Sequence, residues 1–407
     1  MYDEKKTTIA PSTVCPDFDD NLVFVQNPIY SLSQDQQLSH FLTHGTNNQI
    51  VDFRSGLYFN IIMNRSLVPP LFFRRGVNDF VTPNHHVDML ELSKLITITD
   101  PQEYGSFCKT DENGDLWLVK SSQVVESRIK QSTKWWNFER TDYFQNEIEF
   151  HNGWREQPVD KMHLLYQKSN ASCSAMEHPI RGWTVNYNQT LANEIIRATP
   201  RPKYIRDLAT RITRKIFGFH QYAALHWRYN RKDFMKHCPP EVSPGWDSCP
   251  LYDTVTSNVE QFCQLVVDHL KPYKLKHIYL AAPPNEIKLI NQIKQILTEK
   301  HSYTVATLKD SQVLMHQFYP HCEYLHSHEE DVFSTVEQEI SFQVIDTQIY
   351  PTYFLVNLLY IIVAINMVIQ HSKRTGSIRQ QSAYKHHRFI RNKWFTVSSL
   401  GYFKYTN

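Results

Sequence analysis

The chain has 407 residues, of which 11 are glycine, about 3% against a typical usage of roughly 7%. No two glycines lie two positions apart, so the sequence contains no G-x-G-x-x-G fingerprint, no Walker A loop and no G-x-S-x-G elbow. A hydrophobic content of 41% excludes global disorder, and 43 basic against 41 acidic residues give no general case for nucleic-acid binding. Any bound ligand must therefore be held by side chains and helix ends.

The first 40 residues are polar and interrupted by prolines, and we expect an irregular N-terminal arm. They show no apolar run of the kind found in signal peptides. Apolar residues then recur at helical spacing over residues 48–63. A short strand is expected at Leu67-Val68, ended by Pro69-Pro70. This order of helix and strand predicts an α/β unit, and residues 41–200 are expected to form one domain.

Residues 78–200 have a mixed pattern. Their tryptophans Trp135, Trp136 and Trp154 are expected to lie in a core, and aromatic residues of a ligand subsite are the alternative interpretation. The pattern breaks at residues 198–202, which are rich in proline, so we place a domain boundary there. The second domain is expected over residues 201–350, followed by a divergent segment, apolar and then basic, over 351–407.

The second domain has a regular alternation. Apolar stripes predict helices over residues 204–218, 254–270 and 285–299, and apolar runs predict strands over 222–227, 276–282 and 303–308. Such an alternation is typical of a parallel sheet with helices on its faces. In these sheets, ligands bind outside the carboxyl ends of the strands.

His226 and Arg228 lie at the carboxyl end of the strand predicted over 222–227. They are two positions apart and therefore point to the same side. A guanidinium at this place can hold a phosphate through two parallel hydrogen bonds. A structural ion pair of Arg228 is the alternative interpretation.

A second candidate site is the turn Gly45-Thr-Asn-Asn48-Gln49, just before the first predicted helix. A helix start offers free N–H groups to an anion, and Asn48 could add its side-chain amide. An ordinary helix cap is the alternative interpretation of the same residues.

Several segments, in order and over roughly residues 40–343, resemble the GDP-fucose protein O-fucosyltransferases. Gly45-Thr-Asn-Asn48-Gln49 and Asn64-Arg-Ser-Leu-Val-Pro69-Pro70 are similar to the G-x-x-N-Q … N-R-T-L-V-x-P-P opening of that family. Ala224-Leu-His226-Trp-Arg228-Tyr-Asn-Arg-Lys-Asp233-Phe234 resembles its H-x-R … D segment, in a His-Trp-Arg form closest to nematode members. Residues 277–282 resemble its next core strand, and residues 333–340 its V-E-Q-E-I segment.

The resemblance implies a GT-B-like α/β fold, with two Rossmann-like domains whose parallel sheets face a cleft. It implies an inverting, metal-independent glycosyltransferase that moves fucose from GDP-fucose, a donor substrate and not a cofactor, to a Ser or Thr hydroxyl of a protein acceptor. Asn48 and Arg228 would be the catalytic residues. The donor would be bound by Gly45, Asn48, His226, Arg228, Asp233 and Thr352.

The charge that develops on the leaving diphosphate can be stabilised by a fixed guanidinium and by helix N–H groups. These groups would replace the glycine-rich loop that the chain lacks. A general base for the acceptor hydroxyl stays open among Asp52, Asp233 and Glu241.

The chain departs from the family after residue 343, where a Ser/Thr-rich loop would bind the β-phosphate. Only Thr352 stands near the expected place. The alternative function is therefore an inactive relative that binds a nucleotide or a protein.

Residues 352–369 carry no charge, have the length of a membrane-span candidate and are followed by basic residues. A buried helix of an α/β fold is the other interpretation of this stretch.

The resemblance and three N-x-S/T sequons, at Asn64, Asn170 and Asn188, together indicate the lumen of the endoplasmic reticulum or Golgi. None of the seven cysteines forms a C-x-x-C pair. Cys238 and Cys249 could close a proline-rich loop by a disulfide, or both could be thiols.

The densest set of metal-binding side chain types is formed by His321, Cys322, His326 and His328. We interpret them as loop residues and expect no metal site, because loop histidines are commoner than zinc ligands and the resemblance implies no metal.

Overall fold

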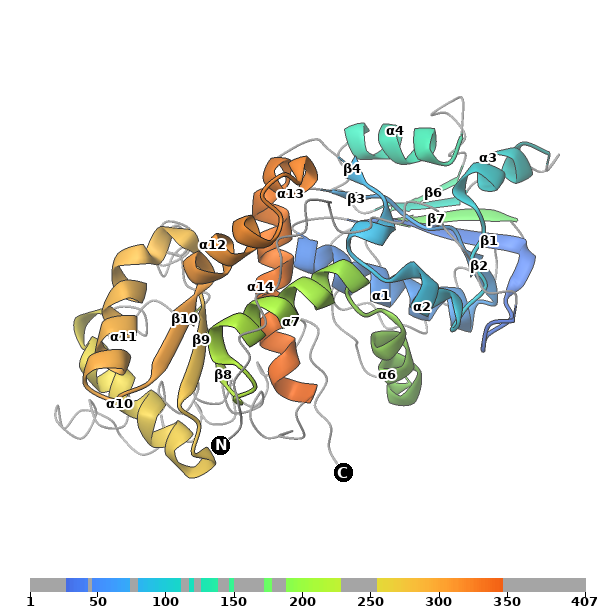
Figure 1. Cartoon of the computed structure of the whole chain (residues 1–407). Coiled ribbons are helices and arrows are strands. Elements are labelled where there is room, and N and C mark those ends of the chain that lie inside the picture. The colour runs from blue at the N-terminus through green and yellow to red at the C-terminus, as the bar shows by residue number, and fades with distance from the viewer. Residues whose placement is uncertain are drawn as a thin grey trace, which may run out of the picture. The chain divides into compact units, whose positions relative to one another are not determined.

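The computed structural model describes residues 27–42, 46–73, 80–110, 117–120, 126–137, 146–149, 172–177, 188–227 and 255–346 (Figure 1). Within these ranges the chain divides into two compact units, and the division falls between Lys203 and Tyr204. Each unit contains a parallel sheet with helices packed on it. The predicted α/β class with two parallel sheets is therefore confirmed. The predicted division of the chain into residues 1–40, 41–200, 201–350 and 351–407 stays a prediction.

In the first unit the described strands are β1 (Ser33–Phe41), β2 (Arg65–Leu67), β3 (Phe72–Phe73), β4 (Phe80–Val81), β5 (Trp117–Lys120), β6 (Asn146–Glu149) and β7 (Cys173–Glu177). The described helices are α1 (Thr46–Ile62), α2 (Met89–Ser93), α3 (Pro101–Thr110), α4 (Glu126–Trp135) and α6 (Gln189–Ala198). The expected helix over 48–63 and strand at Leu67 are thus confirmed, each with ends shifted by one or two residues.

The main sheet of the first unit has the strand order β2-β1-β7-β5-β6 among the described residues, and all neighbours are parallel. Figure 1 shows α1 and α2 on one face of this sheet and α3 and α4 on the other. Leu38 of β1 belongs to the core on the α1 face, and Phe41 to the core beneath α3 and α4. Strand β1 is therefore covered on both faces.

Strand β1 corrects the expectation of an irregular arm up to residue 40. Its sequence, SQDQQLSHF, begins with polar residues and does not alternate, so local pattern gives no strand signal. The strand forms because it lies between β2 and β7, where both of its edges are hydrogen-bonded. Pairing and burial decide strand formation here more than local preference.

The expectation that Trp136 lies in a core is confirmed. Its side chain is fully buried, and its ring centroid lies 5.1 Å from that of Phe41 and 5.6 Å from that of Tyr104. The neighbouring Trp135 is partly buried and donates its indole N–H to the carbonyl of Pro69 at 3.2 Å. Trp154 lies outside the described residues.

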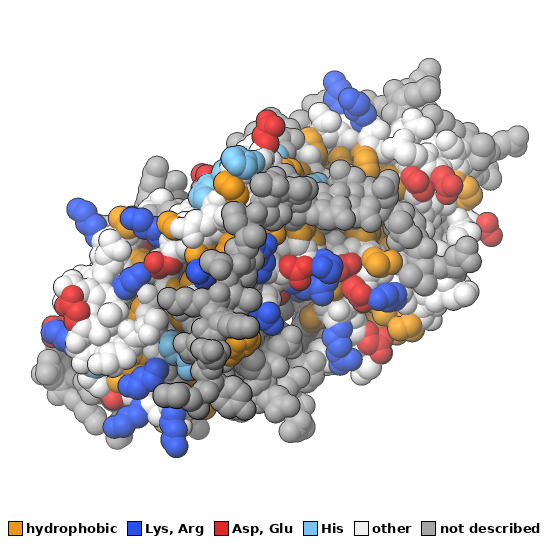
Figure 2. All heavy atoms as spheres, viewed as in Figure 1, with side chains coloured by type: hydrophobic (Ala, Val, Ile, Leu, Met, Phe, Trp, Pro, Cys, Tyr) orange, Lys and Arg blue, Asp and Glu red, His pale blue; other side chains and the backbone are white. Residues whose placement is uncertain are grey.

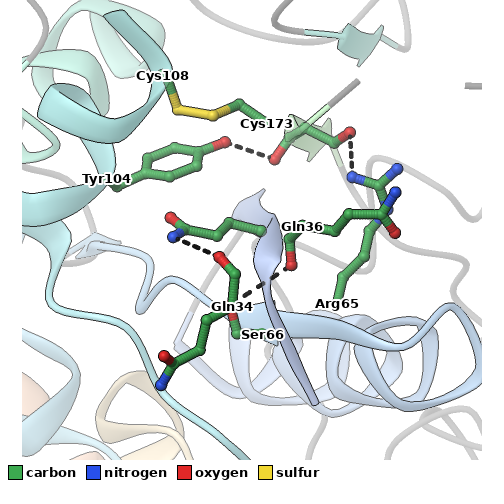
Figure 3. The surroundings of a disulfide bond; sticks show 9 residues. Gln34, Gln36, Arg65, Ser66, Tyr104, Cys108 and Cys173 are labelled. Atoms are coloured by element: carbon green, nitrogen blue, oxygen red, sulfur yellow. Dashed lines mark hydrogen bonds between the residues drawn. A yellow bond between two sulfur atoms is a disulfide. The ribbon is translucent and has the colours of Figure 1, made fainter. Parts of the chain in front are cut away.

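A disulfide joins α3 to β7 on this face of the sheet (Figure 3). Cys108 of α3 is bonded to Cys173 of β7, 65 positions away. Beside the disulfide, the hydroxyl of Tyr104 donates to the carbonyl of Ser174 at 2.7 Å. The buried guanidinium of Arg65 donates to the Ser174 hydroxyl at 3.2 Å. These contacts connect α3, β2 and β7 through side chains as well as through the sheet.

In the second unit the described strands are β8 (Ala223–His226), β9 (His277–Ala281) and β10 (Thr304–Thr307). The described helices are α7 (Lys203–Phe217), α10 (Val259–Leu270), α11 (Ile287–Glu299), α12 (Leu308–Phe318), α13 (Glu323–Ser327) and α14 (Glu329–Asp346). The predicted alternation of helices and strands from residue 204 onward is confirmed, with the strands shorter than expected.

The second sheet has the order β10-β9-β8 among the described residues and is parallel. Alternate residues of its strands, such as Leu225, Leu280 and Val305, pack with α10 and α11. Helix α14 packs on β8 and β9, and α12 packs on β10. This arrangement leaves the carboxyl ends of the three strands at one edge, as the parallel topology requires.

The core between this sheet and α10 contains Cys263, which is fully buried. It is the one free cysteine among the described residues. Burial, and secondarily the charge of Glu260, raise the pKa of its thiol to about 12. The thiol is therefore protonated and unreactive in the folded unit.

Within the described ranges, no helix is long and apolar enough to cross a membrane. The stretch 352–369, expected as a span or a buried helix, lies outside those ranges, as does the proposed pair of Cys238 and Cys249.

Candidate functional site

Strand β8 ends at His226, at the carboxyl edge of the second sheet. His226 is in register with Ala281 of β9, and the N–H of Trp227 donates to the carbonyl of Ala281 at 2.7 Å. The Trp227 side chain is buried against Phe262 of α10. Because side chains alternate along a strand, His226 faces the opposite side, where α14 packs, and it is exposed. Its predicted place at the strand end is confirmed, and its role as a ligand stays a prediction.

Several of the expected site residues lie outside the described residues. These are Gly45, Arg228, Asp233, Glu241 and Thr352. The assignment of Arg228 to a phosphate therefore stays a prediction.

Helix α1 begins at Thr46, so Asn47 and Asn48 lie in its first turn. The N–H groups of a first turn have no carbonyl partner within their own helix. The helix start expected for an anion site is thus present. The structure does not describe the side chain of Asn48.

Gln49, the last residue of the GTNNQ segment, has a structural function that the sequence pattern did not reveal. Its amide nitrogen donates to the carbonyl of Phe73 at 2.8 Å, and its amide oxygen accepts from the N–H of Phe73 at 2.7 Å. Gln49 is fully buried. It therefore replaces a missing strand neighbour for Phe73 and fastens β3 to α1.

Asp52, one of the three candidates for a general base, lies one turn further along α1. Its side chain is fully buried in the first unit. A general base must come within hydrogen-bonding distance of the acceptor hydroxyl. Asp52, Asp233 and Glu241 all stay predictions for the general base.

Glu337 of α14 belongs to the V-E-Q-E-I segment, and the sequence analysis assigned it no role of its own. Its carboxylate accepts a hydrogen bond from the backbone N–H of Ala282, the residue that follows β9. The Oε1 atom is enclosed and has no hydrogen-bond partner among the described residues. Burial raises the pKa of Glu337 to about 8, and the Ala282 hydrogen bond opposes that rise. A carboxyl group whose buried Oε1 has no partner among the described residues thus lies at the same sheet edge as His226.

A signal for Glu337 exists in the sequence. Phe333, Val336 and Ile340 follow the spacing i, i+3 and i+7, which defines the buried stripe of a helix. Glu337 occupies position i+4, inside that stripe. A carboxylate in an apolar stripe is uncommon in a purely structural helix, and such groups with shifted pKa values gather at functional sites.

Tyr279 of β9 lies on the same face of the sheet as His226. Its hydroxyl is 3.0 Å from the Oγ of Ser311 in α12. Burial first, and the nearby Glu337 second, raise the pKa of Tyr279 well above its ordinary value. The phenol therefore stays neutral beneath the site, and it adds no charge to the environment of Glu337.

The described residues contain no group of three or more His, Cys, Asp or Glu side chains placed to hold a metal ion. Within the set noted in the sequence, Cys322 is disulfide-bonded. The Nε2 of His326 lies 3.2 Å from the carbonyl of Pro320, and the Nδ1 of His328 lies 2.8 Å from the carbonyl of Tyr324.

Comparisons with known proteins give likenesses of shape alone. No protein-family model and no curated protein matches the sequence. The structure is similar to POFUT1 in complex with GDP-fucose, with 12% identity, a TM-score of 0.46, and coverage of 78% of this chain and 95% of that one. It is also similar to the fucosyltransferase NodZ from Bradyrhizobium, with 12% identity, a TM-score of 0.39, and coverage of 74% and 83%. Likenesses at this level do not assign a function.

Proposed function

We propose that this protein is a protein O-fucosyltransferase, which transfers fucose from GDP-fucose to a Ser or Thr hydroxyl of a protein acceptor with inversion and without a metal ion. The proposal combines the ordered motif segments of the sequence with the geometry of the second unit. It places the nucleotide of the donor at the carboxyl edge of the sheet β10-β9-β8, the edge at which parallel sheets bind ligands.

The observation that carries the proposal is the carboxyl group of Glu337. Its Oε1 is buried and without a partner among the described residues, and it lies beside the ends of β8 and β9. A carboxylate is an acceptor with two oxygens, and it pairs well with two adjacent N–H donors. The Watson–Crick edge of guanine presents such a pair. The protonated acid, which a pKa of about 8 favours at pH 7, would match an adenine edge with one donor and one acceptor, so binding of guanine requires that Glu337 lose its proton.

The remaining donor contacts follow from the same placement. His226, exposed at the end of β8, would contact the nucleotide, and Arg228 would neutralise the diphosphate as the bond to fucose breaks. Asn48, at the start of α1, would contact the sugar-phosphate region according to the motif resemblance. No cofactor is required, because the leaving diphosphate is stabilised by side chains and N–H groups.

The proposed compartment is the lumen of the endoplasmic reticulum or Golgi. The disulfide between Cys108 and Cys173 supports it, because disulfides persist mainly in oxidising compartments. Cys322 is also disulfide-bonded, which adds to this support. We propose a protein as the acceptor substrate because of the motif resemblance alone.

The first experiment measures GDP binding by titration calorimetry with the wild-type protein, Glu337→Gln and the control Glu330→Gln. Glu330 is an exposed carboxylate in the first turn of the same helix. Loss of a paired, charged acceptor is expected to weaken GDP binding at least about tenfold, with no change for the control. Binding of ADP with the affinity of GDP would contradict the assignment of Glu337.

The second experiment measures transfer. The protein is incubated with GDP-fucose and folded acceptor domains, and GDP release is followed for the wild-type protein, Arg228→Ala and the exposed control Arg197→Ala. Release that is lost only in Arg228→Ala is the expected result. Absence of both release and GDP binding would exclude the enzyme.

An inactive relative is the second candidate function, and one sequence observation favours it. The chain has only Thr352 where the family carries a Ser/Thr-rich phosphate loop. This candidate predicts GDP or protein binding without transfer to any acceptor. The same two experiments separate the candidates, since binding that depends on Glu337 with no GDP release supports the inactive relative.

A further inference from the structure

The amino edge of the second sheet, opposite the candidate site, gathers exposed cations and an exposed aromatic ring. Two turns form it, one between α7 and β8 and one between α10 and β9. We call this surface the basic edge, and its residues are Arg214, Lys215, Phe219, Lys271, Lys274 and Lys276, all exposed. In Figure 2, Lys and Arg side chains gather at the lower left of the view, over the end of α10.

The two turns are held side by side by stacked rings. The imidazoles of His220 and His277 stack with centroids 4.9 Å apart and planes inclined by 20°. Phe217 contacts His277 with a centroid distance of 5.6 Å and stacks on Tyr222 at 4.9 Å. His220 precedes β8 and His277 begins β9, so the ring contacts join the two turns into one surface.

The cations of the basic edge have no carboxylate partner within the described residues. Lysines elsewhere in the unit do, since Lys294 pairs with Asp310 and Lys300 with Glu260. Arg214 instead lies 5.7 Å over the ring of Phe219, and Lys276 lies 5.1 Å over the ring of Tyr303. The nearest acid along α10, Asp268, accepts a hydrogen bond from Gln264 one turn earlier. The charge of the edge is thus available to an anionic partner.

Phe219 is the most exposed large apolar side chain among the described residues, at 92%. It follows Gly218, whose φ of +64° lets the chain turn sharply at the end of α7. A single exposed apolar side chain is common on protein surfaces, but here the ring stands among cations that have no carboxylate partner in the described residues. A partner that offers both negative charge and an apolar layer therefore fits this surface.

We propose that the basic edge docks on an anionic lipid bilayer, which in the lumenal compartment proposed above requires anionic lipids in the lumenal leaflet. Lipid phosphates and carboxylates would bind the five cations, and the ring of Phe219 would enter the interfacial layer, where aromatic rings are stabilised. A soluble polyanion offers the negative charge but no apolar layer for the ring. Because the edge lies at the opposite ends of the strands from His226, docking leaves the candidate site open.

The test is cosedimentation of the full chain with vesicles of phosphatidylcholine alone or mixed with phosphatidylserine. The wild-type protein is expected to bind the mixed vesicles, to bind neutral vesicles weakly, and to be released by salt. Each lysine at an anionic surface contributes a factor of about five, so Lys271→Gln with Lys274→Gln is expected to weaken binding about 25-fold. Phe219→Ala is expected to weaken it about tenfold, and Phe219→Trp to preserve it.

The matched control is Lys288→Gln with Lys309→Gln, which removes the same charge from exposed positions of α11 and α12. If the control weakens binding as much as the pair in the basic edge, net charge explains the effect and the proposal is wrong. Equal binding of the wild-type protein and all variants also overturns it, because another part of the chain then binds the lipid. Retention on heparin without vesicle binding would identify a soluble polyanion and exclude the bilayer.

Discussion

At the scale of single residues, two buried groups titrate far from their ordinary range. Glu337, at the proposed nucleotide site, has its pKa raised to about 8. His40 of β1 has its pKa lowered to about 4, because burial disfavours the imidazolium more than its hydrogen bond to Asn60 favours it. Both groups are therefore neutral at pH 7, and each links pH to a measurable property.

Binding of GDP at the proposed site should release a proton from Glu337. Two N–H donors bind the carboxylate form of Glu337, while the free protein holds the acid at pH 7, below its pKa of about 8. GDP affinity is expected to rise with pH up to about 8 and then level off. Calorimetry in buffers of different ionisation enthalpy would show the released proton, and Glu337→Gln should release none. Affinity that is constant between pH 6 and 8 would contradict the proposal.

His40 should make the first unit sensitive to acid. Its pKa is lower in the folded protein than in the unfolded chain, so the unfolded chain binds more protons between pH 6.5 and 4. The contribution to stability is complete above pH 6.5 and is lost as the pH falls toward 4, by roughly 3 kcal/mol at most. Urea unfolding at several pH values should show a flatter profile for His40→Gln than for the wild-type protein and for the exposed control His321→Gln. Identical slopes would show that His40 is not the cause.

Gly56 has no side chain and therefore leaves room for the ring of His40. A Cβ at Gly56 of α1 would lie 2.7 Å from the Cδ2 and Nε2 atoms of the His40 ring. Gly56→Ala is therefore expected to destabilise the protein by about 1–3 kcal/mol, although alanine is the better helix former. Thermal unfolding checks this, and an increase in melting temperature would contradict it.

The sequence predicts residue roles only where a pattern exposes them. His226 follows an apolar strand, and its place at the strand end could be predicted from period and polarity alone. Glu337 could be noticed on the apolar stripe of α14, but its hydrogen bond to Ala282 depends on how α14 crosses the sheet. Gln49 looks like part of a helix cap, and only the folded chain shows its two bonds to Phe73.

At the scale of elements, helices with a single apolar stripe were predictable and strands without alternation were not. Helices α7 and α11 have regular stripes, and their predicted ends differ from the observed ends by a few residues. Strand β1 has no such signal, because both of its faces and both of its edges are buried. Its existence depends on β2 and β7, which are distant along the chain.

The contact between α1 and β3 gives a prediction at this scale. In Gln49→Leu, both backbone groups of Phe73 lose their partner in a buried place, which is expected to cost about 3 kcal/mol. The exposed control Gln189→Leu in α6 should change stability by less than about 0.5 kcal/mol. Denaturant unfolding measures both. Equal stabilities for the two variants would show that β3 does not depend on Gln49.

At the scale of the whole molecule, the sequence predicted two α/β units, because alternating helices and strands of this length favour parallel sheets. It could not predict the strand order of the first sheet, in which β7 lies between β1 and β5. That order joins residues far apart along the chain, and the disulfide from α3 to β7 strengthens the same long-range connection.

Reduction should therefore destabilise the first unit. The disulfide closes a chain of 65 positions, and its loss in the double variant Cys108→Ser with Cys173→Ser is expected to cost about 3–4 kcal/mol. With reductant added to both, the wild-type protein should melt at the same temperature as the variant, because the disulfide of Cys322 is then also broken in both proteins. A variant as stable as the oxidised wild-type protein would contradict the prediction.

The buried thiol of Cys263 can be used to measure the rate at which the second unit opens. Alkylating reagents attack thiolates, and a thiol with a pKa of about 12 inside the core between α10 and β9 reacts only after that core opens. The rate at which mass spectrometry finds Cys263 labelled therefore reports how often the unit unfolds locally. A nucleotide bound at the edge formed by β8, β9 and α14 should slow that rate, and the measurement requires no substitution in the chain.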